Sequence, residues 1–352
     1  MMDDWLSQSC PRPDQRQADA ARARQAVLTK PAGSLGVLED IAVQLAGLQG
    51  CERPSVEHPA IVLFAGDHGV TAQGVSAFPS AVTVEMLRNF ARGGAAISVL
   101  ARALGASLTV VDAGTLEHAP IDGVITDKPR AGTRDFSQGP ALTGDEVAHA
   151  LGAGRRAVAR AKAGGADLLI LGEMGIGNTT TAAAIAAALL RRAPGDIVGA
   201  GTGLGQDGLE HKTGVIERAL ERHGIVRSQA AALEVLACVG GLEIAALSGA
   251  IIAAAQARLP VLVDGFIVTV ASLAAVRLNP GCRPWLLFSH RSAEQGHWVV
   301  LDALEAKPIL DLALRLGEGS GAAVAFPIVR LACKLHAEMA TFEEAQVSQR
   351  ET

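Results

Sequence analysis

The chain of 352 residues is long enough for one large domain or two modest ones, and its 49% hydrophobic and 19% charged residues exclude a largely disordered protein. Aromatic residues make up only 3% and tyrosine is absent, which argues against ring platforms that stack single-stranded nucleic acid. A net charge of −5 provides no basic surface of the kind that binds duplex DNA or RNA.

The cysteines and the apolar stretches indicate where the protein works. Its five cysteines are odd in number, widely spaced and without a CxxC pair, which argues against a disulfide framework or a structural zinc site and favours a reducing cytoplasm. The acidic start, residues 1–9, does not resemble a secretory signal. The most apolar stretch, residues 244–255, is much shorter than the roughly 20 residues of a membrane span. We therefore expect a cytoplasmic protein with no nucleic-acid or membrane partner.

The first 58 residues are expected to be mostly helical. Residues 18–28 and 37–48 place apolar side chains at helical spacing, on either side of the turn-rich segment 30–36. Residues 51–59 then read as a linker into the first strand.

From residue 60 the chain alternates between short apolar runs and alanine-rich helical stretches. The apolar runs are 60–65, 108–114, 167–172, 259–265 and 284–290. The helical stretches are 82–104, 145–162, 180–192, 242–257 and 267–278. Buried strands that alternate with helices predict an α/β fold with a parallel sheet and right-handed crossovers.

In such a sheet the active site lies outside the carboxyl ends of the strands. The polar residues that this pattern places there are Asp67, His68, Asp112, Glu173, Asp264, Ser289 and His290. The segment 309–341 is expected to return to helix apart from one glycine-rich loop, and 322–339 has an apolar face with Pro327 near its start. The residues from 342 on are polar and are expected to fray.

The first of three glycine-rich loops, residues 171–180, follows a strand and opens a helix. Its backbone N–H groups can hold an anion at the positive helix end. The spacing copies a P-loop, but Asn178 replaces the lysine, which weakens a triphosphatase interpretation and leaves a monophosphate site. A plain strand-to-helix turn, capped by Asn or Thr, is the alternative.

The other two loops, residues 199–205 and 316–322, carry weaker signals. Lys212 follows the first of them and could complete a phosphate clamp, or it could equally be a solvated lysine. Glu318 lies between glycines in the second, where it could act as a general base or stabilise a cationic sugar, or could be only a cap or a solvated charge.

The segment Asp67-His68-Gly69 contains residue types that occur in metal sites and in Ser-His-Asp triads. No HExxH, facial or GxSxG pattern accompanies it, so metal catalysis is not expected. We interpret His68 and His290 as hydrogen-bonding residues of the loops.

Taken in order, these segments resemble the nicotinate-nucleotide–dimethylbenzimidazole phosphoribosyltransferase family of cobalamin synthesis, over nearly the whole chain. The matching segments are 30–36, 65–69, 74–79, 82–83, 89–90, 93–97, 172–180, 201–203, 289–294 and 315–322. The resemblance implies a Rossmann-like parallel sheet flanked by helices in residues 59–304, and a small helical domain built from residues 1–58 and about 305–352. The catalytic loop 315–322 would lie at their junction. It also implies a homodimer in which the neighbour's small domain closes the active site.

The reaction that the resemblance implies needs no metal or redox cofactor. It moves the 5-phosphoribosyl group from nicotinate mononucleotide to 5,6-dimethylbenzimidazole, with inversion at the anomeric carbon, and yields α-ribazole 5′-phosphate and nicotinate. By the same resemblance, Glu318 takes the proton from the benzimidazole, and Glu173 contacts the ribose and stabilises charge.

The resemblance also assigns the two binding regions. The residues expected at the phosphate and ribose are Gly175, Gly177, Asn178, Thr179, Gly201, Gly203, Lys212 and Ser292. The residues expected at the benzimidazole, which needs apolar walls, are Ser76, Phe78, Ser80, Met86 and Leu316. One departure is Glu85, where relatives commonly have Gln before the methionine, and it bears on base selection.

Two other classes of function stay open from the residues alone. A phosphate-binding α/β kinase or phosphatase is disfavoured because the P-loop lysine and a metal-binding carboxylate cluster are lacking. A nucleotide sensor or carrier without turnover is disfavoured because Glu173 and Glu318 are both present.

Overall fold

The computed structural model describes residues 4–199, 201, 203, 205–225 and 231–348. Its centre is a six-stranded sheet in the order β3-β2-β1-β4-β5-β6, and every neighbouring pair is parallel. The strands are β1 (Pro59–Gly66), β2 (Ser107–Gly114), β3 (Val124–Thr126), β4 (Leu168–Met174), β5 (Val261–Val263) and β6 (Leu286–Phe288). The predicted parallel α/β fold is confirmed.

Thirteen α-helices are resolved within the described residues. They are α1 (Gln15–Val27), α2 (Val37–Gln49), α3 (Ala81–Arg92), α4 (Ala96–Leu104), α5 (Gly144–Ala163), α6 (Asn178–Leu190), α7 (Gln206–Arg222), α8 (Ala232–Val239), α9 (Leu242–Gln256), α10 (Phe266–Leu278), α11 (Gln295–Ala303), α12 (Ser320–Glu338) and α13 (Phe342–Ala345). The short 3₁₀ helices are η1 (Asp4–Ser7), η2 (Gly69–Gln73), η3 (Pro194–Asp196) and η4 (Pro280–Trp285).

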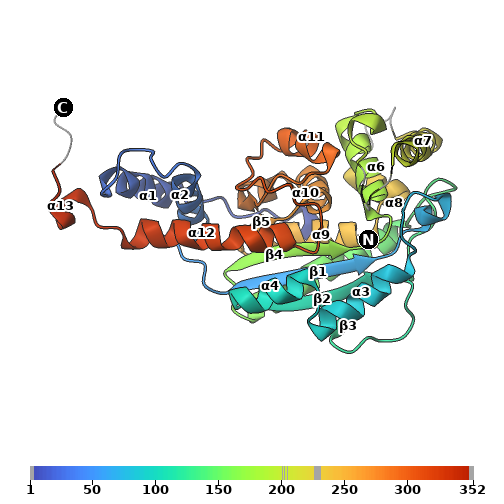
Figure 1. The fold of residues 1–352 in the computed structure, drawn as a ribbon, viewed down its shortest axis with the longest axis horizontal. Helices are drawn as coiled ribbons and strands as arrows, with labels where there is room; N and C mark the ends of the chain where they lie inside the picture. Colours follow the sequence, from blue (N-terminus) through green and yellow to red (C-terminus); the bar gives the residue numbers. More distant parts are fainter. Residues whose placement is uncertain (1–3, 200, 202, 204, 226–230, 349–352) are drawn as a thin grey trace.

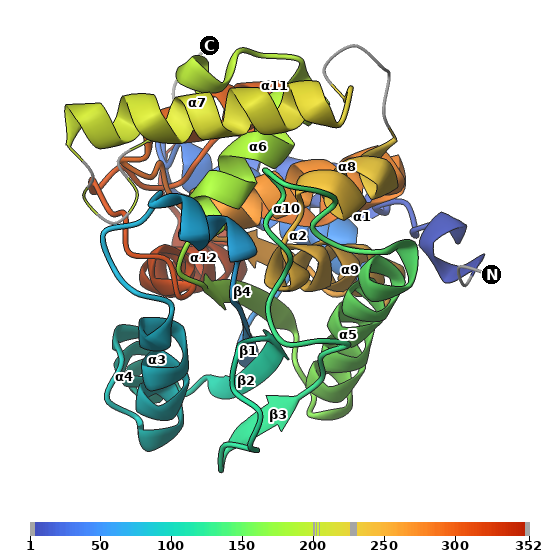
Figure 2. The ribbon, with the colours of Figure 1, turned by 90° about the vertical axis from the view of Figure 1, so that its right-hand side faces the viewer.

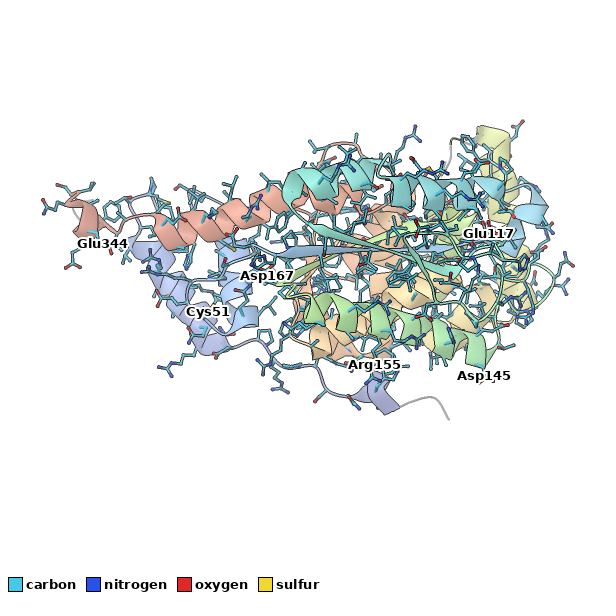
Figure 3. All side chains as sticks on the ribbon, turned by 90° about the horizontal axis from the view of Figure 1, so that it is seen from below. Cys51, Glu117, Asp145, Arg155, Asp167 and Glu344 are labelled. Atoms are coloured by element: carbon cyan, nitrogen blue, oxygen red, sulfur yellow. The ribbon has the colours of Figure 1, made fainter. Side chains whose placement is uncertain are left out.

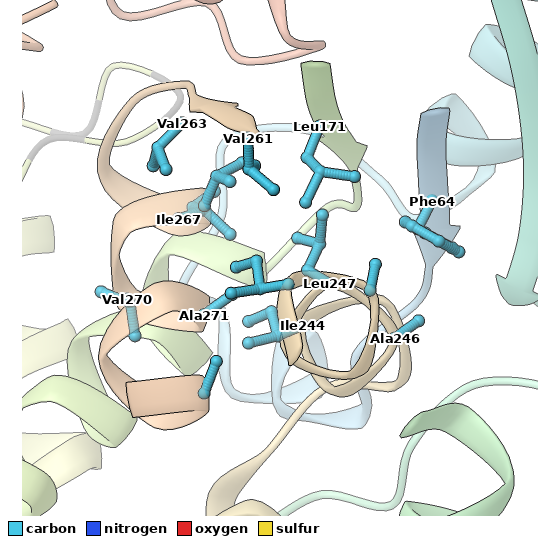
Figure 4. Close-up of a cluster of buried hydrophobic side chains, with 14 of the residues drawn as sticks. Phe64, Leu171, Ile244, Ala246, Leu247, Val261, Val263, Ile267, Val270 and Ala271 are labelled. Atoms are coloured by element: carbon cyan, nitrogen blue, oxygen red, sulfur yellow. The ribbon is translucent and has the colours of Figure 1, made fainter. Parts of the chain in front are cut away.

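Helices cover both faces of the sheet, which is why its central strands are continuous apolar runs. Helices α3, α4 and α12 lie on one face, and α9 lies on the other with α5 and α10 beside it (Figure 2). Every residue of β1 is buried. Figure 4 shows the core under the second face, where Phe64 and Leu171 of the strands approach Ile244 and Leu247 of α9.

The edge strand β3 was not expected from the sequence. It has only three residues, which are half-buried or exposed, and it pairs with β2 alone. A strand this short and this exposed leaves no apolar run for a sequence pattern to detect.

The stretch 82–104, expected as one helix, is two helices. Helix α3 ends at Gly93, whose φ of 82° turns its N–H back onto the carbonyls of Asn89 and Phe90. The chain then restarts as α4 at Ala96. A glycine in the left-handed conformation is a common helix end, and here it interrupts an otherwise unbroken apolar pattern.

The C-terminal prediction needs three corrections. Residues 309–315, outside the expected glycine-rich loop, are not helical, and Leu310 forms a parallel bridge with His290. Pro327 lies well inside α12, whose packing against α4, β4 and β5 outweighs the lost backbone hydrogen bond. The end expected to fray forms α13, which starts with a capping box between Thr341 and Glu344.

The two ends of the chain meet on α12. Helices α1 and α2 lie along the outer half of α12 in Figure 1. The guanidinium of Arg24 donates to the carbonyl of His336 at 2.8 Å, and Leu28 pairs with Thr341 in an antiparallel bridge. The domain boundaries at residues 58 and 305 stay a prediction.

Acidic residues lie at both edges of the sheet, the one at which the strands begin and the one at which they end. Asp167, before β4, accepts the N–H groups of Glu57 and His58 at the amino edge. Glu117 follows β2 at the carboxyl edge, and Figure 3 shows the two residues well apart along the molecule.

Over the described residues, no helix is both long and apolar enough to cross a membrane.

Candidate active site

A cavity of about 350 Å³ opens where β4, β5 and β6 end. The predicted site residues on its wall are Phe78, Met86, Glu173, Gly175, Asn178, Thr179, Gly201, Ser292, Leu316 and Glu318. The structure therefore brings residues from widely separated segments of the sequence to one place. This place is the carboxyl edge of the sheet, as the sequence predicted.

Glu318 lies in a backbone conformation that is unusual for its residue type. Its φ is 64°, between φ values of 87° at Gly317 and 85° at Gly319. The side chain is buried, and its Oε2 accepts the N–H of Ile97 in the first turn of α4 at 3.2 Å. Burial raises the pKa of Glu318, the Ile97 N–H lowers it, and the nearby charge of Asp264 raises it further.

Glycines let this loop approach β4. A Cβ at Gly172 would collide with the carbonyl of Glu318, and a Cβ at Gly317 would collide with the carboxyl of Glu173. The N–H of Glu318 donates to the carbonyl oxygen of Glu173 at 3.2 Å. The two glutamates predicted from separate loops are thus neighbours, and the glycines in both loops are needed for that.

Glu173 is fully buried, and the side-chain amide of Asn178 donates a hydrogen bond to it. Burial raises its pKa well above the ordinary value, and the charges of Asp264, Glu243 and Glu318 raise it further. These surroundings therefore favour the protonated form of Glu173 more than those of an exposed glutamate do.

The sequence placed two further cavity residues at the strand ends: Asp264, without a role, and His290, as a hydrogen-bonding residue. The carboxylate of Asp264 accepts the N–H of Gly319 at 3.1 Å and that of Ala322 at 2.9 Å. His290 Nδ1 lies 3.8 Å from Asp264 and bonds the hydroxyl of Ser289 at 3.0 Å, and burial lowers the pKa of His290. The sequence signal was their position after β5 and β6, but it could not show their partners.

Lys212 is almost completely buried, which excludes the solvated-lysine alternative. Its ammonium donates to the Thr179 hydroxyl at 2.9 Å and to the Gly199 carbonyl at 3.3 Å. Burial lowers the pKa of Lys212 to about 8, and the charge of Glu294 opposes this. The lysine lies behind Thr179 rather than on the cavity wall.

Of the remaining residues expected at the phosphate, Gly177 begins α6 with a φ of 95°, and Gly203 is exposed with a φ of 105°. Neither is on the described cavity wall. Ala200, Thr202 and Leu204 of the second glycine-rich loop lie outside the described residues. Glu294, which the sequence did not single out, lines the cavity beside Gly201.

The apolar side chains on the cavity wall include Phe78 and Met86, together with Val82, Phe266 and Ile267. Phe78 and Leu316 are more than half exposed at its mouth. Ser76 and Ser80 lie off the described wall: the Ser76 hydroxyl accepts the N–H of Phe78, and that of Ser80 bonds Thr71. Glu85 is exposed on α3.

His68 and Asp112 serve the scaffold. His68 bonds Glu243 at 2.8 Å through Nε2 and Thr181 at 2.9 Å through Nδ1, as the hydrogen-bonding interpretation predicted. Asp112 forms an ion pair with Lys128 at 2.6 Å. In the part of the chain that the structure describes, no three His, Cys, Asp or Glu side chains are grouped so that they could hold a metal ion.

Known proteins resemble this chain over its full length. A family model described as phosphoribosyltransferase matches residues 10–347. A nicotinate-nucleotide–dimethylbenzimidazole phosphoribosyltransferase of Bradyrhizobium sp. (strain ORS 278) is 64% identical over 351 residues, which is 100% of both chains. The enzyme of that name from Pseudomonas putida (strain W619) is 58% identical over 98% of both chains.

Solved structures agree with the sequence relatives. A crystal structure of the enzyme of that name from Thermus thermophilus has a TM-score of 0.91 and 46% identity, and the match covers 96% of this chain and 100% of that one. A second structure from the same organism, described as CobT, has a TM-score of 0.92 at 46% identity, over 95% of this chain and 100% of that chain.

Proposed function

Because the chain belongs to the nicotinate-nucleotide–dimethylbenzimidazole phosphoribosyltransferase family, we propose that it transfers the 5-phosphoribosyl group of nicotinate mononucleotide to 5,6-dimethylbenzimidazole. The products are α-ribazole 5′-phosphate and nicotinate, and the step belongs to cobalamin synthesis. The observation that carries this proposal is the cavity itself. Its wall combines two buried glutamates with apolar side chains, and a buried lysine bonds Thr179 from behind that wall.

The reaction exchanges one bond to the ribose carbon C1′ for another. The bond to the pyridinium nitrogen breaks, and its electron pair leaves with nicotinate. A benzimidazole nitrogen attacks from the opposite side, and the proton on the second nitrogen goes to Glu318. The ring N–H becomes more acidic as the ring gains positive charge, so a carboxylate with a raised pKa is a sufficient base.

Glu173 is proposed to act on the ribose. The pyridinium nucleotide carries positive charge at the atom next to C1′, and a nearby cation lowers the pKa of a carboxyl group. Substrate binding would therefore shift Glu173 towards its ionised form, which stabilises the oxocarbenium-like sugar of the transition state. Asn178 fixes the carboxyl in place through its amide.

The phosphate is proposed to lie beside Gly175, Gly201 and Ser292 on the cavity wall. Thr179 opens onto the same wall, and Lys212 bonds it from behind. An ammonium in this position adds positive charge to the start of α6, where the helix dipole already favours an anion.

The remaining expectations belong to this proposal as well. A homodimer in which the partner's small domain closes the cavity would cover Phe78 and Leu316, which are exposed at the mouth of the single chain. Sedimentation of the purified protein tests this, and a monomer at assay concentration would contradict it.

All five thiols are free, in keeping with the cytoplasmic location expected from the sequence.

The test of the activity is incubation of the purified protein with nicotinate mononucleotide and 5,6-dimethylbenzimidazole, with the products identified by mass. We expect α-ribazole 5′-phosphate and nicotinate in equal amounts. Nicotinate released without a ribosylated base would indicate a hydrolase, and no reaction would contradict the proposal.

A panel of other benzimidazoles and purines, assayed with wild type and Glu85→Gln, shows whether Glu85 affects base selection.

A further inference from the structure

Helix α12 begins without a cap of its own. Its N-cap residue is Gly319, which has a φ of 85° and no side chain to bond the first-turn N–H groups. Such groups need a partner when a helix starts in a buried place, and Gly319 and Ser320 are both buried. The partner comes from elsewhere in the chain.

Asp264, directly after β5, supplies both missing acceptors. Its Oδ2 accepts the N–H of Gly319, the N-cap residue, and its Oδ1 accepts the N–H of Ala322, three residues later. In a capping box these same two donors are bonded by side chains of the helix itself. Here a single carboxylate from another strand end bonds both, which ties the start of α12 to β5.

This tie holds the loop that carries Glu318. The left-handed conformation is strained for a residue with a Cβ, so Glu318 keeps its φ of 64° only because its surroundings hold it there. On one side its N–H bonds the Glu173 carbonyl on β4. On the other side the next residue, Gly319, is bonded to Asp264.

We propose that Asp264 is a positioning residue for the phosphoribosyl transfer: its carboxylate fixes residues 317–319 against the ends of β4 and β5 and so aims the Glu318 carboxylate into the cavity. This inference rests on the proposed function, in which Glu318 is the base.

The same carboxylate also acts on Glu318 through its charge. Asp264 raises the pKa of Glu318, whereas the Ile97 N–H of α4 lowers it. The other ionisable groups at the loop are Glu173 on β4, with Glu243 of α9 behind it, His290 after β6 and Arg315 on the rim. Removing the charge at residue 264 must therefore lower the pKa of Glu318 and weaken the base.

The test is the variant Asp264→Asn, which keeps the shape but loses the charge and one acceptor. Misplacement of a reacting group by about 1 Å can cost about 100-fold in rate, so we expect kcat to fall by about 10- to 100-fold. KM for nicotinate mononucleotide should change much less. The acidic limb of the kcat–pH profile, where the base becomes protonated, should move to lower pH.

Asp67→Asn is the matched control. Asp67 is also a buried aspartate after a strand, but it accepts the N–H of Leu116 and is not on the described cavity wall. Its variant should keep the wild-type acidic limb. An Asp264→Asn enzyme with wild-type kcat, or with lost activity but an unmoved limb, overturns the proposal.

A second measurement needs no variant and decides the matter if Asp264→Asn does not fold. In the wild-type protein, hydrogen exchange of the Gly319 and Ala322 amides should be slow, although first-turn amides usually exchange fast. Fast exchange at both overturns the anchor. If wild type makes no α-ribazole phosphate, the proposed function fails with the catalytic part of this inference, while protected amides would still demonstrate the anchor.

Discussion

In two regions of this molecule, glycines let two backbone segments pack closely against each other. The contact between α5 and α9 stabilises the fold, whereas the contact at the cavity brings ionisable side chains together. Where α5 crosses α9, a Cβ at Gly154 would collide with the Ala246 carbonyl, and one at Gly249 would collide with the Leu151 carbonyl. The two helices gain buried apolar contact, and their backbone groups keep their hydrogen bonds within each helix. At the cavity, Gly172 and Gly317 instead bring two glutamates together.

The difference is one of charge. Close packing at the α5–α9 contact stabilises the fold, because neutral surfaces leave water together. Close packing at the loop 315–322 buries carboxyl groups beside one another and raises the pKa values of Glu173 and Glu318, which costs stability at neutral pH. Substitutions in the first region should therefore change stability, and substitutions in the second should change turnover.

The largest effect is expected at the proposed base. Glu318→Gln should lower kcat by about 10²- to 10⁴-fold, because a general base contributes about that much. Its melting temperature should equal or exceed that of wild type, since a buried like charge is lost. Glu305→Gln is the control, because Glu305 also has a positive φ, of 50°, but is exposed. Wild-type turnover by Glu318→Gln would exclude it as the base.

The next effect concerns the α5–α9 contact. Gly154→Ala and Gly249→Ala should each lower the free energy of unfolding by about 1–3 kcal/mol, as overpacking does, while kcat per folded enzyme stays unchanged. Urea unfolding and active-site titration measure the two quantities.

Gly152→Ala is the control on the same helix, because its new Cβ would meet only the flexible end of Arg156. It should be neutral or stabilising by up to about 1 kcal/mol. Equal losses in all three variants would show that helix contact is not the cause.

Lys212 is buried like the residues of the α5–α9 contact, but it carries a charge like the residues of the cavity. Lys212→Met should raise KM for nicotinate mononucleotide by about 5- to 30-fold, because the ammonium behind Thr179 acts on the phosphate through its charge, and such a charge contributes about 1–2 kcal/mol in a partly buried site. In wild type, kcat/KM should fall as the pH rises through about 8, where the ammonium loses its proton. The variant should lack this alkaline limb, and a limb that persists would contradict the assignment.

The smallest effect is expected from Glu173→Gln, measured as stability. The pKa of Glu173 is raised by folding, so its stabilising contribution is present at low pH and is lost as the pH rises through the raised value. The glutamine variant should thus be more stable than wild type by about 0.5–2 kcal/mol at neutral and alkaline pH, and no more stable in acid. Thermal melts across pH check this, and a constant difference would rule out titration of Glu173 as the cause.

Much of the fold was predictable, because each buried strand and each amphipathic helix reports its own environment. The runs at β1, β2 and β4 and the helices α5 and α9 lie close to their expected bounds. The failures were local. Gly93 divides an apolar pattern, β3 is too short to show one, and residues 309–315, expected as helix, form a loop in which Leu310 pairs with His290.

By itself the sequence predicted the parallel sheet, the edge of the sheet at which the cavity opens, the family resemblance and the two glutamates of the cavity wall, Glu173 and Glu318. Only the tertiary structure decided that Lys212 is buried behind Thr179, and that Ser76 and Ser80 bond their neighbours away from the described cavity wall. Only it connected Asp264 to the start of α12, across more than fifty residues. The physical reason is that periodicity records whether a residue is buried, whereas its partner depends on which strand ends the crossovers bring together.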